Sequence, residues 1–458
     1  MHHSAADLGI LKRQQALMAL LLSCAATAGW ADDAAAAFRD GFLAGKVDWP
    51  AVEARAKEEG KVNLYYWGGD DLLNVWMDSV VAPALAEKGV KLNPVRITGT
   101  KDAVDLVLTE KSSGKGIGAG SVDMIRVNGE NFAALKHADA LFGSFAQLLP
   151  NAVNLEWSAG EPRGLLNLRD FGVETNSAEV RWSGEEYNCA VNSKRVADAD
   201  IPSTFDGLLA YVKKHPGKFT YVKPPHYLGN TFVEEAIYAH NPDGTGAAPF
   251  QQSIKDIQPA ELARLITPGL EYLKSIEPYL LNGASGTARY PEDNKALDGL
   301  FLNREIDFSC KFGMYSVATG LSTGNYPEGA KQFIFPKDTM IKNKNYLVIP
   351  SNAPNAAAAL VVANWMTSVE SQTSKLKMVG MPSGIDSWKL SSADAAAIAA
   401  ASPGLVGITQ ADMDANAAPD TNVTLVDVIE ATWLGYIERK DTAPIAHIVA
   451  KAYATVGK

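Results

Sequence analysis

Three successive strand–helix units near the start of the chain place the strongest limit on its fold. Apolar runs of strand type span residues 62–67, 90–97 and 123–127. A turn and a pattern with the 3.6-residue period of a helix follow each run, with the helices ending at Glu87, spanning Ala103–Lys111 and starting at Glu130. Parallel strands need such helical crossovers, so the alternation predicts an α/β fold with a mostly parallel sheet flanked by helices.

The third unit says most about function. Its strand breaks at Asn128-Gly129, and its helix begins at Glu130. In open α/β sheets, small ligands bind where a parallel strand ends in a turn and a helix N-terminus follows. The sequence therefore predicts a ligand site here, with Asn128, Glu130 and Asn131 as candidate contacts.

The N-terminus is typical of a secretory signal. Lys12-Arg13 supplies a positive end, residues 16–23 form an apolar core too short to span a bilayer, and small residues continue to Ala31. We expect a signal peptide of residues 1–31 and a periplasmic mature protein, and cleavage before a lipidated Cys24 is the alternative. In an exported protein, a strand-end site suggests capture of a solute rather than its transformation.

Length and charge narrow the classes further. The chain beyond the signal is too long for one compact core and fits two lobes. The formal net charge is −10, without a basic block, which argues against nucleic-acid binding. The negative charge mainly serves solubility, and it favours a cationic ligand slightly over an anionic one.

The second half of the chain has a less regular pattern. Residues 150–185 show little periodicity, and we expect them to cover a cleft or wrap one lobe. Strand patterns lie at residues 186–196, 219–222, 306–310 and 346–349. Helical patterns begin at residues 201 and 291 and span residues 229–238, 259–275 and 356–367, and residues 393–401 form a helix or a mobile surface turn.

Motifs for catalysis, metals and cofactors are weak. Gly320-Leu321-Ser322-Thr323-Gly324 matches a hydrolase nucleophile pattern, but turn residues follow it where a helix is required, so we expect a surface turn and no enzyme. No histidine pairs with a cysteine or carboxylate at metal-ligand spacing, so we expect no metal and no cofactor. An oxidising periplasm permits a disulfide between Cys189 and Cys310, although isolated cysteines are more often separate buried thiols.

The first strand ends in a second candidate site, Trp67-Gly68-Gly69-Asp70. An aromatic face beside a carboxylate binds organic cations through cation–π and charge contacts. The alternative is that Asp70 only caps the helix that follows, where a carboxylate suits the positive helix end.

Further candidates lie in the middle of the chain. Trp182 and Tyr187 flank the expected crossing between lobes, although tryptophans are more often core residues. Tyr227, Asn230 and Thr231 surround a Gly turn that leads into a helix, whose free N–H groups suit a carboxylate, phosphate or hydroxyl. Lys311 ends a strand and is either a ligand contact or a solvated strand end.

With these segments in place, the chain resembles the type II extracellular substrate-binding proteins of ABC importers. It is most similar to the YnjB-like subgroup, which is related to binders of thiamine, polyamines and ferric ion. The segments that carry the resemblance are Trp67-Gly68-Gly69, 121–132, 141–143, 217–232, 303–309 and 346–365.

The resemblance implies two α/β lobes joined by two crossing strands, near residues 186–192 and 345–349. The first lobe would span residues 32–185 and the second residues 186–345, with residues 346–458 forming the return to the first lobe and C-terminal helices. It implies ligand contacts at Trp67, Gly68, Gly69, Asn128, Glu130, Tyr227, Asn230 and Thr231.

The same resemblance implies capture of a small molecule by hinge closure and delivery to an inner-membrane ABC permease, by a protein we expect to be monomeric. The ferric relatives use a clustered tyrosine site in the second lobe, which this sequence lacks, so iron is disfavoured. A thiamine- or polyamine-like cation is the expected ligand. A secreted enzyme on the same fold and a ligand-loaded partner of a membrane receptor are the alternatives.

Overall fold

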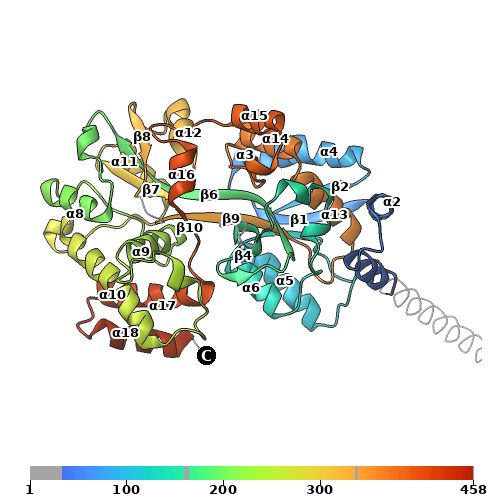
Figure 1. Cartoon of the computed structure of the whole chain (residues 1–458), viewed down its shortest axis with the longest axis horizontal. Helices are drawn as coiled ribbons and strands as arrows, with labels where there is room; N and C mark the ends of the chain where they lie inside the picture. Colours follow the sequence, from blue (N-terminus) through green and yellow to red (C-terminus); the bar gives the residue numbers. More distant parts are fainter. Residues whose placement is uncertain (1–32, 159–164, 336–338, 457–458) are drawn as a thin grey trace, which may run out of the picture.

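The computed structural model describes residues 33–158, 165–335 and 339–456. The predicted signal peptide and the alternative lipid anchor at Cys24 lie outside these residues. The chain forms two α/β lobes side by side, joined near the middle of the molecule by the strands β6 and β9 (Figure 1).

The first lobe has the predicted strand–helix units. β1 (Lys61–Trp67) pairs in parallel with β2 (Lys91–Ile97) and with β3 (Met124–Val127). The helices α5 (Thr100–Ser112) and α6 (Glu130–His137) follow β2 and β3. The first predicted helix is one continuous element built from α3 (Asp71–Trp76), a π-helical stretch (Met77–Val81) and α4 (Ala82–Glu87). The structure confirms the three predicted strand–helix units. They could be predicted because each one carries its own hydrophobic periodicity in the sequence.

Both crossing strands are longer than predicted. β6 (Glu179–Asn192) places Val180 and Trp182 in the core of the first lobe, and Tyr187 and later residues in the core of the second. β9 (Met340–Val348) begins in the second core and pairs antiparallel with β6 and with β3. The chain therefore passes from one lobe core to the other between Trp182 and Tyr187 on β6, and back between Ile341 and Tyr346 on β9. The expectation that residues 150–185 cover a cleft or wrap one lobe is wrong for residues 179–185, which form the first half of β6.

The second lobe departs from the predicted parallel arrangement. β7 (Phe308–Phe312) and β8 (Ala330–Phe333) both pair antiparallel with β6. Residues 219–222 are not a strand, although the Phe219 carbonyl accepts a hydrogen bond from Leu281 N. The helices of this lobe are α8 (Phe205–Lys214), α9 (Tyr227–Ala239), α10 (Pro259–Ile276), α11 (Asn294–Leu302) and α12 (Ser316–Thr323).

After β9 the chain serves both lobes. α13 (Ala356–Met366) packs on α2 (Trp49–Glu59) in the first lobe, and α14 (Val369–Val379) packs on α15 (Ser392–Ala401), which is a helix rather than a turn. α16 (Gln410–Asn416) leads to β10 (Ala417–Ala418), and α17 (Val423–Trp433) and α18 (Ile445–Val456) pack against α9 and α10. Short elements elsewhere include α7 (Leu165–Leu168), β4 (Arg169–Asp170), β5 (Val173–Glu174) and several 3₁₀ turns.

Cys189 and Cys310 form a disulfide. They face each other across the antiparallel β6–β7 pair, with their Cα atoms 4.0 Å apart. The interpretation as separate thiols is therefore wrong, because strands 121 residues apart in the chain become neighbours in the sheet.

Ser322 lies in the last turn of α12, not in a surface turn. Its hydroxyl donates a hydrogen bond to the Thr319 carbonyl, which is common for serines near helix ends. The helix precedes Gly324 instead of following Ser322, so the strand–turn–helix context of a nucleophile is not formed.

Candidate functional site

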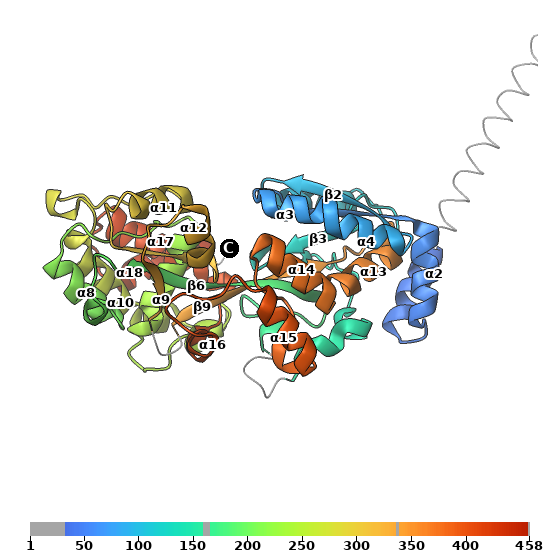
Figure 2. The ribbon, with the colours of Figure 1, turned by 90° about the horizontal axis from the view of Figure 1, so that it is seen from above.

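The carboxyl ends of β1 and β3 point toward the second lobe, and α12 lies across from α3 (Figure 2). Arg126, near the end of β3, lies near Glu185 on β6 and Asp70 before α3, whose negative charges act on its guanidinium, and near Tyr227 at the start of α9. Both lobes and a crossing strand thus contribute to one set of neighbours. We call Trp67, Asp70, Arg126, Glu185 and Tyr227 the interlobe surface.

Trp67, Gly68 and Gly69 form part of the surface of the first lobe at the end of β1. The Trp67 side chain is 43% exposed, and its ring lies over Gly69, where an added Cβ would come within 2.2 Å of it. Gly68 is pressed against Arg96, with 2.6 Å between the ideal Cβ position and the arginine Cβ. Gly69 therefore leaves room for the tryptophan ring, and Gly68 leaves room for Arg96.

Asp70 caps α3. Its Oδ1 accepts hydrogen bonds from Leu72 N at 2.9 Å and Leu73 N at 3.0 Å. The capping interpretation accounts for this residue, while its charge still acts on Arg126.

The β3–α6 turn holds the residues predicted from sequence. Asn128 Nδ2 donates to Asn343 Oδ1 on β9 at 3.3 Å, and Asn131 N donates to the Asn128 carbonyl. Glu130 is exposed in the first turn of α6, and its charge helps to raise the pKa of Glu430 on α17, although burial is the larger cause. Glu130 therefore lies near Glu430 of the second lobe.

On the second lobe, Tyr227 is the accessible candidate. Its side chain is 54% exposed, and its ring stacks on Phe312 with 6.2 Å between centroids. Asn230 Nδ2 donates to Glu430 Oε2 at 2.9 Å, and the buried Thr231 hydroxyl donates to the Tyr227 carbonyl. Because α9 begins at Tyr227, Asn230 and Thr231 are inside the helix and not in a turn before it.

Three residues predicted to contact the ligand make their contacts with other residues of the protein instead. Trp182 is fully buried and stacks on Trp76 at 6.2 Å, as the core alternative expected. Tyr187 is fully buried, and its hydroxyl donates to the Cys310 carbonyl at 3.0 Å. Lys311 pairs with Asp298 at 2.5 Å. Trp182 and Tyr187 are therefore closed to a ligand, and the partly exposed Lys311 is held by its carboxylate partner.

The sequence analysis missed Arg126 and Glu185. Burial lowers the pKa of Arg126 to about 10 and raises the pKa of Glu185 to about 7. Glu185 Oε2 accepts a hydrogen bond from Met314 N of the second lobe at 3.3 Å. The available signal was a charged residue inside the apolar strand Met124–Val127, because buried arginines usually have a partner or a task.

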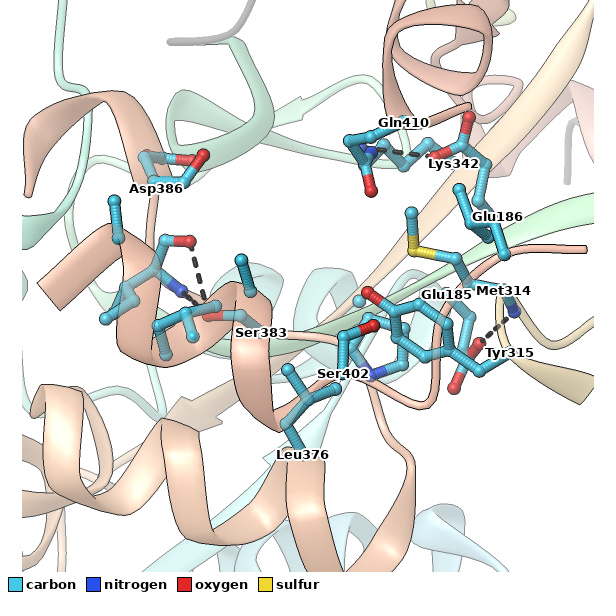
Figure 3. Close-up of a pocket in the computed structure, with 18 of the residues that line it drawn as sticks. Glu185, Glu186, Met314, Tyr315, Lys342, Leu376, Ser383, Asp386, Ser402 and Gln410 are labelled. Carbon is cyan, nitrogen blue, oxygen red and sulfur yellow. Dashed lines mark hydrogen bonds and ion pairs between the residues drawn. The ribbon is translucent and has the colours of Figure 1, made fainter. Parts of the chain in front are cut away.

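A cavity of about 470 Å³ is lined by residues of both crossing strands and of both lobes. Lys342 and Lys344 of β9 line it, whereas the alternating residues Asn343 and Asn345 contact Asn128 and Arg126. Figure 3 shows Ser383 and Asp386 on one side of this cavity and Met314, Tyr315 and Lys342 on the other. Glu185 lines the cavity and also belongs to the interlobe surface, so the two adjoin at this residue, whereas Trp67, Asp70, Arg126 and Tyr227 are not among the residues that line the cavity.

Buried acidic residues on α9 predict that the free energy of unfolding depends on pH. Burial is the main reason that the pKa of Glu234 rises from 4.5 to about 8; the nearby charge of Asp420 adds to the rise and hydrogen bonds from Thr421 oppose it. Glu235 and Tyr238 are the other titratable neighbours on this helix. Between pH 4.5 and 8 the folded protein holds a proton that the unfolded chain has released, so stability falls as pH rises through this window.

Glu234→Gln should flatten this pH dependence, since one shifted group contributes up to about 1.4 kcal/mol per pH unit. Urea unfolding at pH 5, 6, 7 and 8 measures the effect. Glu271→Gln, at an exposed position on α10, is the matched control. Parallel pH profiles for wild type and Glu234→Gln would contradict the assignment.

Comparison with known proteins places the chain among transport proteins. Residues 79–403 match the family described as bacterial extracellular solute-binding protein. Protein YnjB of Escherichia coli (strain K12) is 32% identical over 345 residues, which cover 75% of this chain and 84% of that relative.

Solved structures show the same fold at low identity. A chitin oligosaccharide binding protein matches with a TM-score of 0.61 and 13% identity, over 87% of this chain and 98% of that one. An ABC transporter structure from Clostridium perfringens ATCC 13124 matches with a TM-score of 0.56 and 14% identity, over 82% of this chain and 99% of that one. In the part of the chain that the structure describes, no helix combines the length and apolar character needed to cross a bilayer.

Proposed function

Because the chain belongs to the bacterial extracellular solute-binding protein family and is the solute-binding component of an ABC transporter, we propose that it captures its solute at the interlobe surface. Rotation of the lobes about β6 and β9 encloses the solute, in the manner of other hinged binding proteins. The exported protein acts in the periplasm as a monomer and passes the solute to an inner-membrane permease. The lobes divide at residues 185/186 and 345/346.

The observation that carries this proposal is the pair of exposed aromatic side chains on opposite lobes. Trp67 and Tyr227 are large aromatic groups that soluble proteins usually bury. Tyr227 lies near the charged residues Arg126 and Glu185, and Trp67 precedes Asp70, whose charge acts on Arg126. An aromatic surface on each lobe encloses a flat or apolar part of a solute when the lobes approach. A secreted enzyme on this fold is disfavoured, because Ser322 lacks the context of a nucleophile.

The acidic residues of α6 and α17 that face each other across the lobes favour a solute with a positively charged group, such as thiamine or a polyamine. Glu130 projects from the first lobe, and Glu430 and Asp427 lie opposite on the second. The like charges oppose approach of the lobes, and an organic cation between them removes that repulsion. Trp67 adds a ring face that attracts cations.

The proposal is tested by recovering the solute. Native mass spectrometry of protein purified without refolding should detect one bound small molecule, and small-angle scattering should show a smaller radius of gyration with that molecule than after its removal. A protein whose dimensions are equal with and without its solute would contradict capture by closure.

Glu130→Gln should weaken binding of a cationic solute about 10- to 100-fold, because a hydrogen bond to a charged group contributes about 1.5–3 kcal/mol. Calorimetry with thiamine, spermidine and the co-purified solute measures this loss. Glu58→Gln, an exposed change on α2 in the first lobe, is the control. Tight binding of a dianion that improves in Glu130→Gln would move the ligand class to anions.

A further inference from the structure

Arg126 lacks a counter-ion in the described part of the protein. Its Nη2 donates to Asn345 Oδ1 at 2.9 Å, which is the one hydrogen bond of this guanidinium to a described residue. Its Nε is buried and has no hydrogen-bond partner there. The guanidinium carbon lies 5.7 Å from the centre of the Trp182 ring, a contact that positions the group without neutralising it.

Such a group is unusual in a native protein. Buried polar atoms are nearly always hydrogen-bonded, and buried charges are nearly always paired, because desolvation without compensation is unfavourable. Arg126 alternates along β3 with Ile125 and Val127, whose side chains are buried on the opposite face, and Arg126 itself is partly exposed, so a molecule from outside can reach it. An unsatisfied guanidinium near the end of a parallel strand indicates a partner that arrives from outside the protein.

The nearby carboxylates do not fill this role. Asp70 accepts two hydrogen bonds from the first turn of α3, and Glu185 accepts one from Met314 N. A second buried cation, Lys375, lies 4.9 Å from the centre of the same Trp182 ring and donates to the Trp182 carbonyl. Arg126 therefore forms no ion pair with either carboxylate in the described part of the protein, and its unpaired Nε remains available to an incoming acceptor.

We propose that Arg126 binds an oxyanion group, a carboxylate or a phosphate, of the captured solute. This inference rests on the proposed function and refines its substrate class: the solute carries an oxyanion together with the cationic or aromatic part held by Trp67, Tyr227 and Glu130. Arginine is suited to the task because its planar fork matches the geometry of both oxyanions. Glu185, which lies near Arg126, accepts a hydrogen bond from Met314 N of the second lobe, so an anion bound at Arg126 also lies near that lobe.

The test uses acetate and inorganic phosphate as probes on the full mature protein. Thermal unfolding is followed while each anion replaces chloride at constant ionic strength. Wild type should show a saturable rise in midpoint with one or both probes, and Arg126→Gln should lose it. The stronger probe identifies the oxyanion class. Arg96→Gln, which breaks the exposed Arg96–Asp78 pair, is the matched control and should keep the response.

Glu185→Gln should strengthen anion binding, the opposite of the effect expected for Arg126→Gln. Removing this neighbouring negative charge should lower the half-saturating anion concentration about threefold to tenfold, so a general loss of folding cannot imitate the result. If Arg126→Gln does not fold, the wild-type Nε–Hε resonance of Arg126, assigned by its loss in Arg126→Lys, must shift on addition of phosphate or acetate.

The absence of a saturable response in wild type, or equal responses in wild type and Arg126→Gln, would overturn the assignment. These results are independent of the test of the proposed function. A failure of solute capture appears as unchanged scattering with the co-purified molecule, whereas the anion response reports Arg126 alone.

Discussion

Asp386→Ala should lower the free energy of unfolding by about 3–5 kcal/mol, because it leaves a buried arginine without its partner. Asp386 is 1% exposed and forms an ion pair with the buried Arg181 of β6. Its other oxygen accepts hydrogen bonds from Glu156 N at 2.7 Å and Asn167 Nδ2 at 3.0 Å. One carboxylate therefore ties a crossing strand to two segments of the first lobe.

Guanidinium chloride unfolding, followed by tryptophan fluorescence, measures this loss. Asp78→Ala is the matched control, because it also removes a carboxylate from an arginine, but from an exposed pair with Arg96. The control should change stability little, since water replaces the lost contact. Similar losses in the two variants would show that burial of the Arg181–Asp386 pair has no special effect.

Sequence patterns predicted the first lobe well because its signals are local. Each strand from β1 to β3 is short and apolar, and each helix that follows carries its own cap or period, such as Asp70 before α3. β6 was recognised only in its second half. Its first half has the sequence Glu-Val-Arg-Trp-Ser-Gly-Glu, which is too polar to be read as a buried strand. These polar residues can be buried because they have partners such as Asp386, which lies about two hundred residues away in the chain.

The residues of the candidate site also fall into those that local sequence could predict and those that it could not. Trp67 and Tyr227 were chosen as residues at strand or helix ends, and both are exposed between the lobes. Tyr187, Thr231 and Lys311 were chosen by the same reasoning, but their polar groups bind Cys310, Tyr227 and Asp298. Arg126 was missed because its meaning depends on Asn345, 219 residues away, and on the partner it lacks. No single-sequence pattern contains either contact.

Removing the disulfide should have the other large effect on stability. Cys189→Ala combined with Cys310→Ala should lower the free energy of unfolding by about 4–5 kcal/mol, since closing a loop of this size restricts the unfolded chain. The two residues are 121 positions apart, and the loop between them contains most of the second lobe. Both side chains are buried, so the variant also tests whether alanine is accommodated in the core beside Phe308 and Phe333.

The effect of the crosslink is separated from the effect of packing by using reductant. Unfolding of wild type is measured with and without dithiothreitol, with enough time for reduction in the unfolded baseline. Reductant should move the wild-type midpoint most of the way to that of the double alanine variant and leave the variant unchanged. Because the thiols are buried, reduction should require unfolding, so native protein kept in reductant should retain its disulfide by mass. A wild-type midpoint that reductant does not move would mean that the crosslink contributes little, and that any loss in the variant comes from the packing of β6 against β7.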